Sequence, residues 1–196
     1  MFSNRFAAAL AAFDEANSED PNTEPVNGQP QPRELLYARR LYEWVKRLAP
    51  DASEALLLAA RCQHLRRWEI PRSSFPEGRA GYLQWRAKLS RFHAERSAEI
   101  LRAVGYDDET IRRVQDINRK KNLAADPEVQ TIEDALCLVF LEHQFEDFHA
   151  RHARAKVIDI LRKTWAKMSP RGRAEALRLE YSASARGLIE EALGGA

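Results

Sequence analysis

The sequence predicts an all-α fold, and three observations support this class. Apolar residues recur three and four positions apart along most of the chain, which is the spacing of one face of a helix. Only eight of the 196 residues are glycine, and no run alternates apolar and polar residues as a half-buried strand would. A chain of this length can enclose one hydrophobic core, so we expect residues 1–196 to form a single compact domain of about seven to nine helices.

The N-terminal segment predicts a helix followed by a long loop. Phe2, Phe6, Leu10 and Phe13 follow helical spacing. Residues 17–32, "NSEDPNTEPVNGQPQP", contain four prolines, a glycine and several turn-forming residues, so the helical pattern ends there.

Two further helices are predicted over residues 33–48 and 53–68. Each carries an apolar stripe, and the intervening "APDAS" is typical of a turn that starts a new helix. In the second helix, His64 lies seven residues after Leu57 and four after Ala60, so we expect it on or beside the buried stripe.

Residues 69–79, "EIPRSSFPEGR", predict an interruption. Pro71 and Pro76 each lack an amide donor, so this segment cannot remain helical. Its mixture of arginine, serine and aromatic residues makes it a candidate lid. A helix is predicted over residues 79–104, with His93 four positions after Leu89, and Gly105 is expected to end it.

The C-terminal half predicts four more helical segments. The first begins with acidic residues and ends in "RKK", as the helix dipole favours. The second is almost wholly apolar and is expected to be central. In chain order these segments are residues 108–121, 131–145, 152–168 and 171–193.

Composition narrows the classes of function. The net charge of +2 is too slight to indicate a nucleic acid or an anionic membrane as partner. Cys62 and Cys137 lie in apolar helical patterns without metal-ligand spacing, which indicates small core residues in a reducing, cytoplasmic compartment. The longest uncharged apolar run, residues 135–141, is too short to span a bilayer. The N-terminal segment is expected to be an amphipathic helix rather than a signal peptide.

His64, His93 and Asp134 form the strongest candidate site. They lie on three helices that the apolar pattern predicts to be neighbours, and helical proteins build internal metal sites from such separated ligands. Imidazole and carboxylate groups together suit a divalent cation such as zinc, manganese, iron or nickel. The alternative is that the three side chains only satisfy their own hydrogen bonds.

Seven segments carry a resemblance to a known family: "DEANSEDPN", "LYARR", "RCQHLRRWEIPRSSFP", "RAGYLQWR", "GYDDETIRRV", "EDALCLVFLE" and "KTWAKMS". Together they resemble the domain-of-unknown-function 4202 family over nearly the whole chain. More distantly, the chain is similar to the HD superfamily of helical metal-dependent phosphohydrolases. That resemblance implies an HD-like helical domain with His64, His93 and Asp134 as metal ligands. The sequence departs from it at Ala94, where the superfamily has aspartate. Glu95 points about 100° away from Ala94 on a helix, so it cannot simply replace that carboxylate.

Cationic and aromatic residues gather around this candidate site. Guanidinium groups match phosphate bidentately, so we expect a small anionic ligand that contains phosphate, such as a nucleotide, with Trp68 or Trp85 stacking on its base. Pairing with surface carboxylates is the alternative for each cation. The expected substrate-binding residues are Arg61, Arg67, Arg72, Arg79, Arg86, Trp85 and Lys121.

Two carboxylates are candidates for proton transfer. Glu95 or Glu133 could act as the general base of a metal-assisted hydrolysis of a phosphate ester. Glu133 could equally be a first-turn acid that the helix dipole favours.

Other functions stay open at this point. Glu146 and His149 supply one half of a ferritin-like di-iron motif, without a second copy, and His149 with His152 reads as an exposed face. A non-catalytic helical protein that binds an anionic ligand or a protein partner is the main alternative to the hydrolase.

Overall fold

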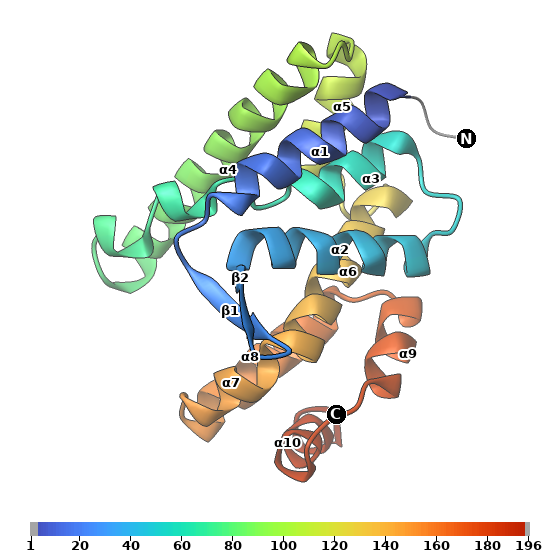
Figure 1. The fold of residues 1–196 in the computed structure, drawn as a ribbon. Coiled ribbons are helices and arrows are strands. Elements are labelled where there is room, and N and C mark those ends of the chain that lie inside the picture. The colour runs from blue at the N-terminus through green and yellow to red at the C-terminus, as the bar shows by residue number, and fades with distance from the viewer. Residues whose placement is uncertain (1–3, 195–196) are drawn as a thin grey trace.

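The computed structural model describes residues 4–194, and they form a mostly helical structure with one small hairpin (Figure 1). The all-α prediction is confirmed in class. Phe2, expected on the first helix, lies outside the described residues. The elements are α1 (Asn4–Ser18), β1 (Thr23–Val26), β2 (Gln29–Pro32), α2 (Arg33–Leu48), α3 (Glu54–Cys62), the 3-10 turns η1 (Arg67–Glu69) and η2 (Arg72–Ser74), α4 (Gly78–Ala103), α5 (Asp108–Asn118), α6 (Pro127–His143), α7 (Phe145–Ala150), α8 (Arg154–Lys167), α9 (Pro170–Arg178) and α10 (Ala183–Gly194).

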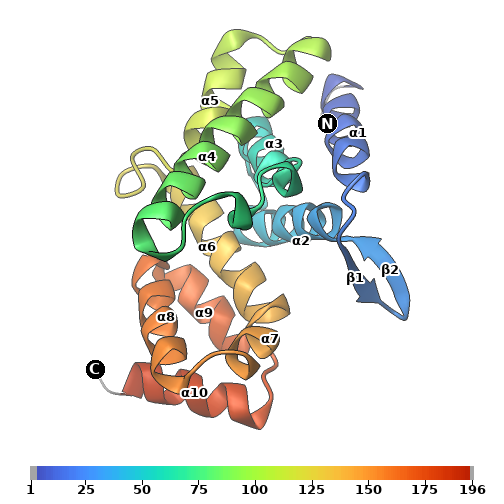
Figure 2. The same ribbon diagram turned by 90° about the vertical axis from the view of Figure 1, so that its left-hand side faces the viewer.

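Helix α6 connects two groups of helices. It packs against α2, α3 and α5 from the first half of the chain and against α7, α8 and α9 from the second. Figure 2 shows the two groups on either end of α6. Its buried residues, which include Ile132, Leu138 and Val139, belong to the hydrophobic core that both groups share, so the prediction of a central apolar helix is confirmed.

The segment expected to be a loop, residues 17–32, contains an antiparallel hairpin. Asn27 and Gly28 both have positive φ, as the two-residue turn of a hairpin requires. Pro25 pairs with Pro30 in a two-stranded ribbon, where a missing amide donor is tolerated on the open edge. The prolines on both sides of Asn27 and Gly28 favour a loop in a prediction from sequence, although Asn-Gly is itself typical of a hairpin turn.

Asp20 fixes the start of α2. Its Oδ2 accepts the Glu34 backbone N–H at 2.9 Å, while its Oδ1 accepts the Asn22 backbone N–H at 2.9 Å. The residue before α2 is Pro32, whose side chain makes no capping hydrogen bond. The Asp20 carboxylate, which lies between α1 and β1, therefore takes the place of the N-cap and holds Glu34 in position.

Helix α3 ends at Cys62, six residues earlier than predicted. Arg66 adopts a left-handed conformation with φ of 51°, and its N–H donates to Asn17 Oδ1 at 3.0 Å. Asn17 lies on α1 and is fully buried. This contact breaks the helix and turns His64 and Arg67 toward the interior of the molecule.

The other boundaries agree with the prediction in part. Helix α6 begins at Pro127, four residues before the predicted start, and α7 is a short helix that was not predicted. Gly105 has φ of 86° and follows the end of α4, as predicted. The single helix expected over residues 171–193 is two helices, α9 and α10. Ser182 begins the second of them by accepting the Ala185 N–H at 3.1 Å.

Candidate functional site: a two-chambered cationic pocket

The structure brings His64 and His93 together. Their ring centroids are 5.9 Å apart, with His64 in the turn after α3 and His93 on α4. His93 is 6% exposed, and its Nδ1 lies 2.8 Å from the Leu65 carbonyl oxygen. Because a carbonyl only accepts, Nδ1 carries the proton and Nε2 presents a lone pair. Burial, and then the neighbouring His64, lowers the pKa of His93 to about 3, so this ring is neutral at pH 7.

His64 is held by three neighbours. Its ring stacks on Tyr37 with centroids 4.2 Å apart. Its Nδ1 lies 3.4 Å from Glu34 Oε2, and Arg67 lies 3.4 Å from its Nε2. Burial lowers the pKa of His64 well below its usual value, and the Arg67 guanidinium lowers it further. The geometry indicates a neutral imidazole that accepts from Arg67 at Nε2 and has its Nδ1 near the Glu34 carboxyl group.

Arg67 is the centre of the arrangement. Its guanidinium lies 4.8 Å from the Trp85 ring centroid and its Nε lies 4.0 Å from Glu34 Oε1. Trp85 is itself fixed, because its indole N–H donates to the Ile70 carbonyl at 2.8 Å. Burial raises the pKa of the Glu34 carboxyl to about 7, although Arg67 opposes this rise.

Two neighbouring hollows share His64 and Arg67 in their walls. The large pocket has a volume of about 660 Å³. The small chamber has a volume of about 110 Å³. The large pocket is lined by Pro21, Asn22, Glu24, Arg33, Glu34, Tyr37, Arg40, His64, Arg67, Trp68, Ile70, Pro71, Arg72, Trp85, Leu136, Phe140 and Gln144. The small chamber is lined by Gln63, His64, Arg67, Arg86, Leu89, Ser90, His93, Asn118, Arg119 and Lys120.

The large pocket combines aromatic rings with guanidinium groups. Trp68, Trp85 and Tyr37 come from η1, α4 and α2, and four arginines stand among them. The segment predicted as a lid supplies one wall through Ile70, Pro71 and Arg72. Such a lining suits a ligand with a flat ring and a negative charge.

Asp134 does not join the histidines, and this corrects the predicted ligand set. Its carboxylate accepts the Ser169 backbone N–H at 2.8 Å, the Ser169 hydroxyl, and the Gln130 amide at 2.9 Å. It is 3% exposed and packs against Gly172 at the start of α9. Within residues 4–194 no group of three or more His, Cys, Asp or Glu side chains could hold a metal ion. The chain therefore does not fit a metal at His64, His93 and Asp134.

The two carboxylates expected to transfer protons lie outside both hollows. Glu95 is exposed on α4, two residues after His93. Glu133 is 3% exposed, forms an ion pair with Lys120 and lies 3.8 Å from Lys167 Nζ. Glu133 thus supports a cation of the small chamber and does not face the ligand space directly.

The predicted substrate-binding residues divide into two groups. Arg67, Arg72, Arg86 and Trp85 line the large pocket or the small chamber. The other three lie outside: Arg61 makes two hydrogen bonds to Asp14, Lys121 pairs with Asp116 at 2.6 Å, and Arg79 is exposed at the start of α4.

The side chains of the half di-iron motif, Glu146 and His149, and the nearby His152 bond to neighbouring protein groups. His149 Nε2 lies 2.9 Å from Glu146 Oε2, and Glu146 Oε1 accepts the Ser182 backbone N–H at 3.0 Å. His152 stacks on Phe148 and its Nδ1 lies 2.8 Å from the Phe148 carbonyl. These contacts give Glu146, His149 and His152 a structural role, so no metal is needed to account for them.

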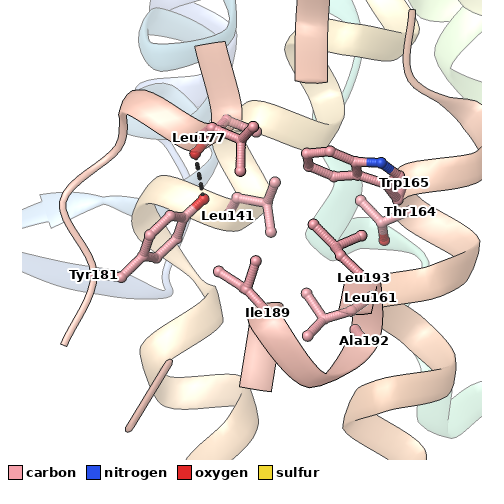
Figure 3. A pocket seen from close by; sticks show the side chains of 10 residues that line it. Leu141, Leu161, Thr164, Trp165, Leu177, Tyr181, Ile189, Ala192 and Leu193 are labelled. Carbon is pink, nitrogen blue, oxygen red and sulfur yellow. Dashed lines mark hydrogen bonds between the residues drawn. The ribbon is translucent and has the colours of Figure 1, made fainter. Parts of the chain in front are cut away.

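A third hollow lies between α6, α8, α9 and α10 and carries no titratable group other than a tyrosine. Figure 3 shows its lining of leucine, isoleucine, alanine and one tryptophan. The Tyr181 hydroxyl donates to the Ala176 carbonyl at 2.9 Å. Its volume of about 10 Å³ is that of a single water site. It offers no chemistry comparable with that of the large pocket.

Sequence reasoning missed Glu34, Gln63, Asn118 and Arg119. Glu34 reads as a first-turn acid, and Asn118 and Arg119 read as the polar end of α5. The signal that could have singled out Glu34 is its position one turn before Tyr37 on the apolar side of α2, where a carboxylate is unexpected.

No helix in the described part of the chain is long and apolar enough to cross a membrane. A family model described as "Domain of unknown function (DUF4202)" matches residues 7–189. Comparison with curated proteins and with solved structures found no match.

Proposed function

The chain belongs to the DUF4202 family, and we propose that its function is to bind a small phosphate-bearing ligand with an aromatic ring, a nucleotide being the simplest example. The observation that carries this proposal is the pair of hollows that meet at His64 and Arg67. Aromatic side chains lie in the large pocket, and the small chamber is lined by the cations Arg67, Arg86, Arg119 and Lys120. A nucleotide offers a flat base and a charged phosphate a few ångströms apart, so it can use both.

The cations of the small chamber support the phosphate end of this ligand. Within residues 4–194, the side chains of Arg86 and Arg119 make no ion pair or hydrogen bond with the protein. Arg67 has its closest carboxylate oxygen at 4.0 Å. Cations that lack a close protein partner are available to an anion, whereas Arg61, bonded twice to Asp14, is not.

Titration with adenosine 5′-monophosphate tests the proposal. We expect the nucleotide to bind and to quench tryptophan fluorescence, and adenosine to bind more weakly because it lacks the phosphate. Arg67→Ala should weaken nucleotide binding at least about tenfold, since a hydrogen bond to a charged group contributes about 1.5–3 kcal/mol. The matched control is Arg79→Ala, which lies outside both hollows and should leave the affinity unchanged. If none of the common nucleoside monophosphates binds, the proposal is wrong.

Hydrolysis of the phosphate ester is a second candidate, and one observation favours it. Glu34 lines the large pocket beside His64 and Arg67, and its pKa of about 7 is suited to a general base near neutral pH. In this reaction the Glu34 carboxylate takes a proton from the attacking water, whose oxygen bonds to phosphorus as the P–O bond to the nucleoside breaks. The Glu34 carboxyl then returns that proton to the departing nucleoside oxygen, while arginines hold the phosphate. No step passes through a metal, because Asp134 does not face the histidines.

The pH dependence of hydrolysis tests the role of Glu34. A base must be deprotonated, so kcat/KM for nucleotide hydrolysis should rise with pH, reach half its maximum near pH 7 and then level off. Glu34→Gln should remove this rise while nucleotide binding persists. If wild-type protein binds the nucleotide without any turnover, the chain is a binding protein and the catalytic candidate falls.

A further inference from the structure

The small chamber contains buried hydrogen-bond acceptors that meet no partner among residues 4–194. They are Gln63 Oε1, His93 Nε2 and Asn118 Oδ1, and all three residues line this chamber. A buried polar atom without a partner costs free energy, so native structures rarely leave three together. Their convergence on one hollow indicates that a bound group completes them.

The chemistry of these atoms is defined by their other contacts. His93 Nδ1 is occupied by the Leu65 carbonyl at 2.8 Å, so Nε2 can only accept. The Asn118 amide nitrogen donates to Cys62 Sγ at 3.2 Å, which leaves Oδ1 as an acceptor. Gln63 Oε1 is an amide oxygen, so it also can only accept. A ligand that satisfies these three acceptors must therefore carry hydrogen-bond donors.

The same chamber also carries positive charge. Arg67, Arg86, Arg119 and Lys120 line it, and Lys120 is placed by a left-handed backbone with φ of 57° and by its ion pair with Glu133. These groups only donate, so a ligand that pairs with them must carry acceptor oxygens and negative charge. A ligand that satisfies both sets must be an anion that still bears a proton.

We propose that the small chamber binds a protonated phosphate group whose P–OH donates to His93 Nε2 and whose remaining oxygens accept from the arginines, and that it thereby selects phosphate over sulfate. Near neutral pH a phosphate monoester has its second pKa at about 6 and keeps a proton in part of its population, whereas sulfate has none to donate. Inorganic phosphate and the terminal phosphate of a nucleotide share this chemistry. The inference rests on the proposed binding of a phosphate-bearing ligand and adds the rule by which that anion is chosen.

Competition on the wild-type protein tests the selectivity. With adenosine 5′-monophosphate bound, inorganic phosphate should displace the nucleotide at a concentration about tenfold lower than sulfate. Tenfold corresponds to about 1.4 kcal/mol, which is of the order of one unmet buried hydrogen bond. If the nucleotide binds and the two anions compete equally, the inference is wrong while the proposed function stands. If the nucleotide does not bind at all, the proposed function fails first.

Replacement of His93 tests the assigned acceptor. His93→Leu keeps a buried side chain of similar size but removes Nε2, so it should bring the phosphate-to-sulfate ratio close to one. His149→Leu, an imidazole on α7 outside both hollows, is the matched control and should keep the wild-type ratio. If His93→Leu does not fold, Asn118→Leu tests the same selectivity at a second acceptor. Full selectivity in a folded His93→Leu protein would overturn the assignment.

Discussion

Asp134→Ala is expected to lower the free energy of unfolding by about 2–4 kcal/mol, because it leaves partly buried donors without an acceptor. In the wild type, one carboxylate accepts from the Ser169 backbone, the Ser169 hydroxyl and the Gln130 amide. The two bonds from Ser169 join α6 to the start of α9, whereas Gln130 lies on α6 itself. The loss should appear as a lower urea midpoint with an unchanged slope.

Two controls make the Asp134 experiment specific. Asp134→Asn keeps an acceptor for the Ser169 N–H and should lose less stability than Asp134→Ala. Asp147→Ala removes an exposed partner of Arg151 and should change the free energy of unfolding by less than about 0.5 kcal/mol. Elemental analysis of the same proteins completes the test. A variant of wild-type stability that had lost a stoichiometric divalent metal would restore Asp134 as a ligand.

The helices could be predicted because their signals are local. The apolar stripe of α2, the acidic first turn of α5, and Gly105 after α4 all lie within a few residues of what they control. The hairpin at residues 23–32 was missed although its Asn-Gly signal was present. The prolines around that turn are compatible with a two-stranded ribbon and not only with a loop.

The candidate site could be predicted only in part, because its decisive contacts join distant residues. The turn that aims His64 and Arg67 depends on Asn17, 49 residues before Arg66. Asp134 was expected to be buried, which is correct, but its partner Ser169 lies 35 residues further along the chain. The spacing of apolar residues predicts which face of a helix is buried, but it does not predict which polar group contacts that face.

The second large effect is expected at Glu133, where breaking a buried ion pair should lower the free energy of unfolding by about 2–3 kcal/mol in Glu133→Ala. The estimate lies below that for a fully buried pair because the Lys120 side chain is 27% exposed, against 4% for Glu133. Chemical denaturation measures the loss. Asp159→Ala, which removes an exposed partner of Lys163, is the matched control and should have little effect.

Phosphate affinity separates the two roles that Glu133 could have. If Glu133 only supports Lys120, its removal frees that ammonium group from a competing carboxylate, so phosphate binding by the folded Glu133→Ala protein should hold or strengthen. If Glu133 were instead the general base, any nucleotide hydrolysis would be lost in a protein of nearly wild-type stability. Because Glu133 lies outside both hollows and its Oε2 pairs with Lys120, we expect the first outcome. The carboxylate that the sequence singled out for proton transfer would then act on the ligand only through the lysine that it holds in the small chamber.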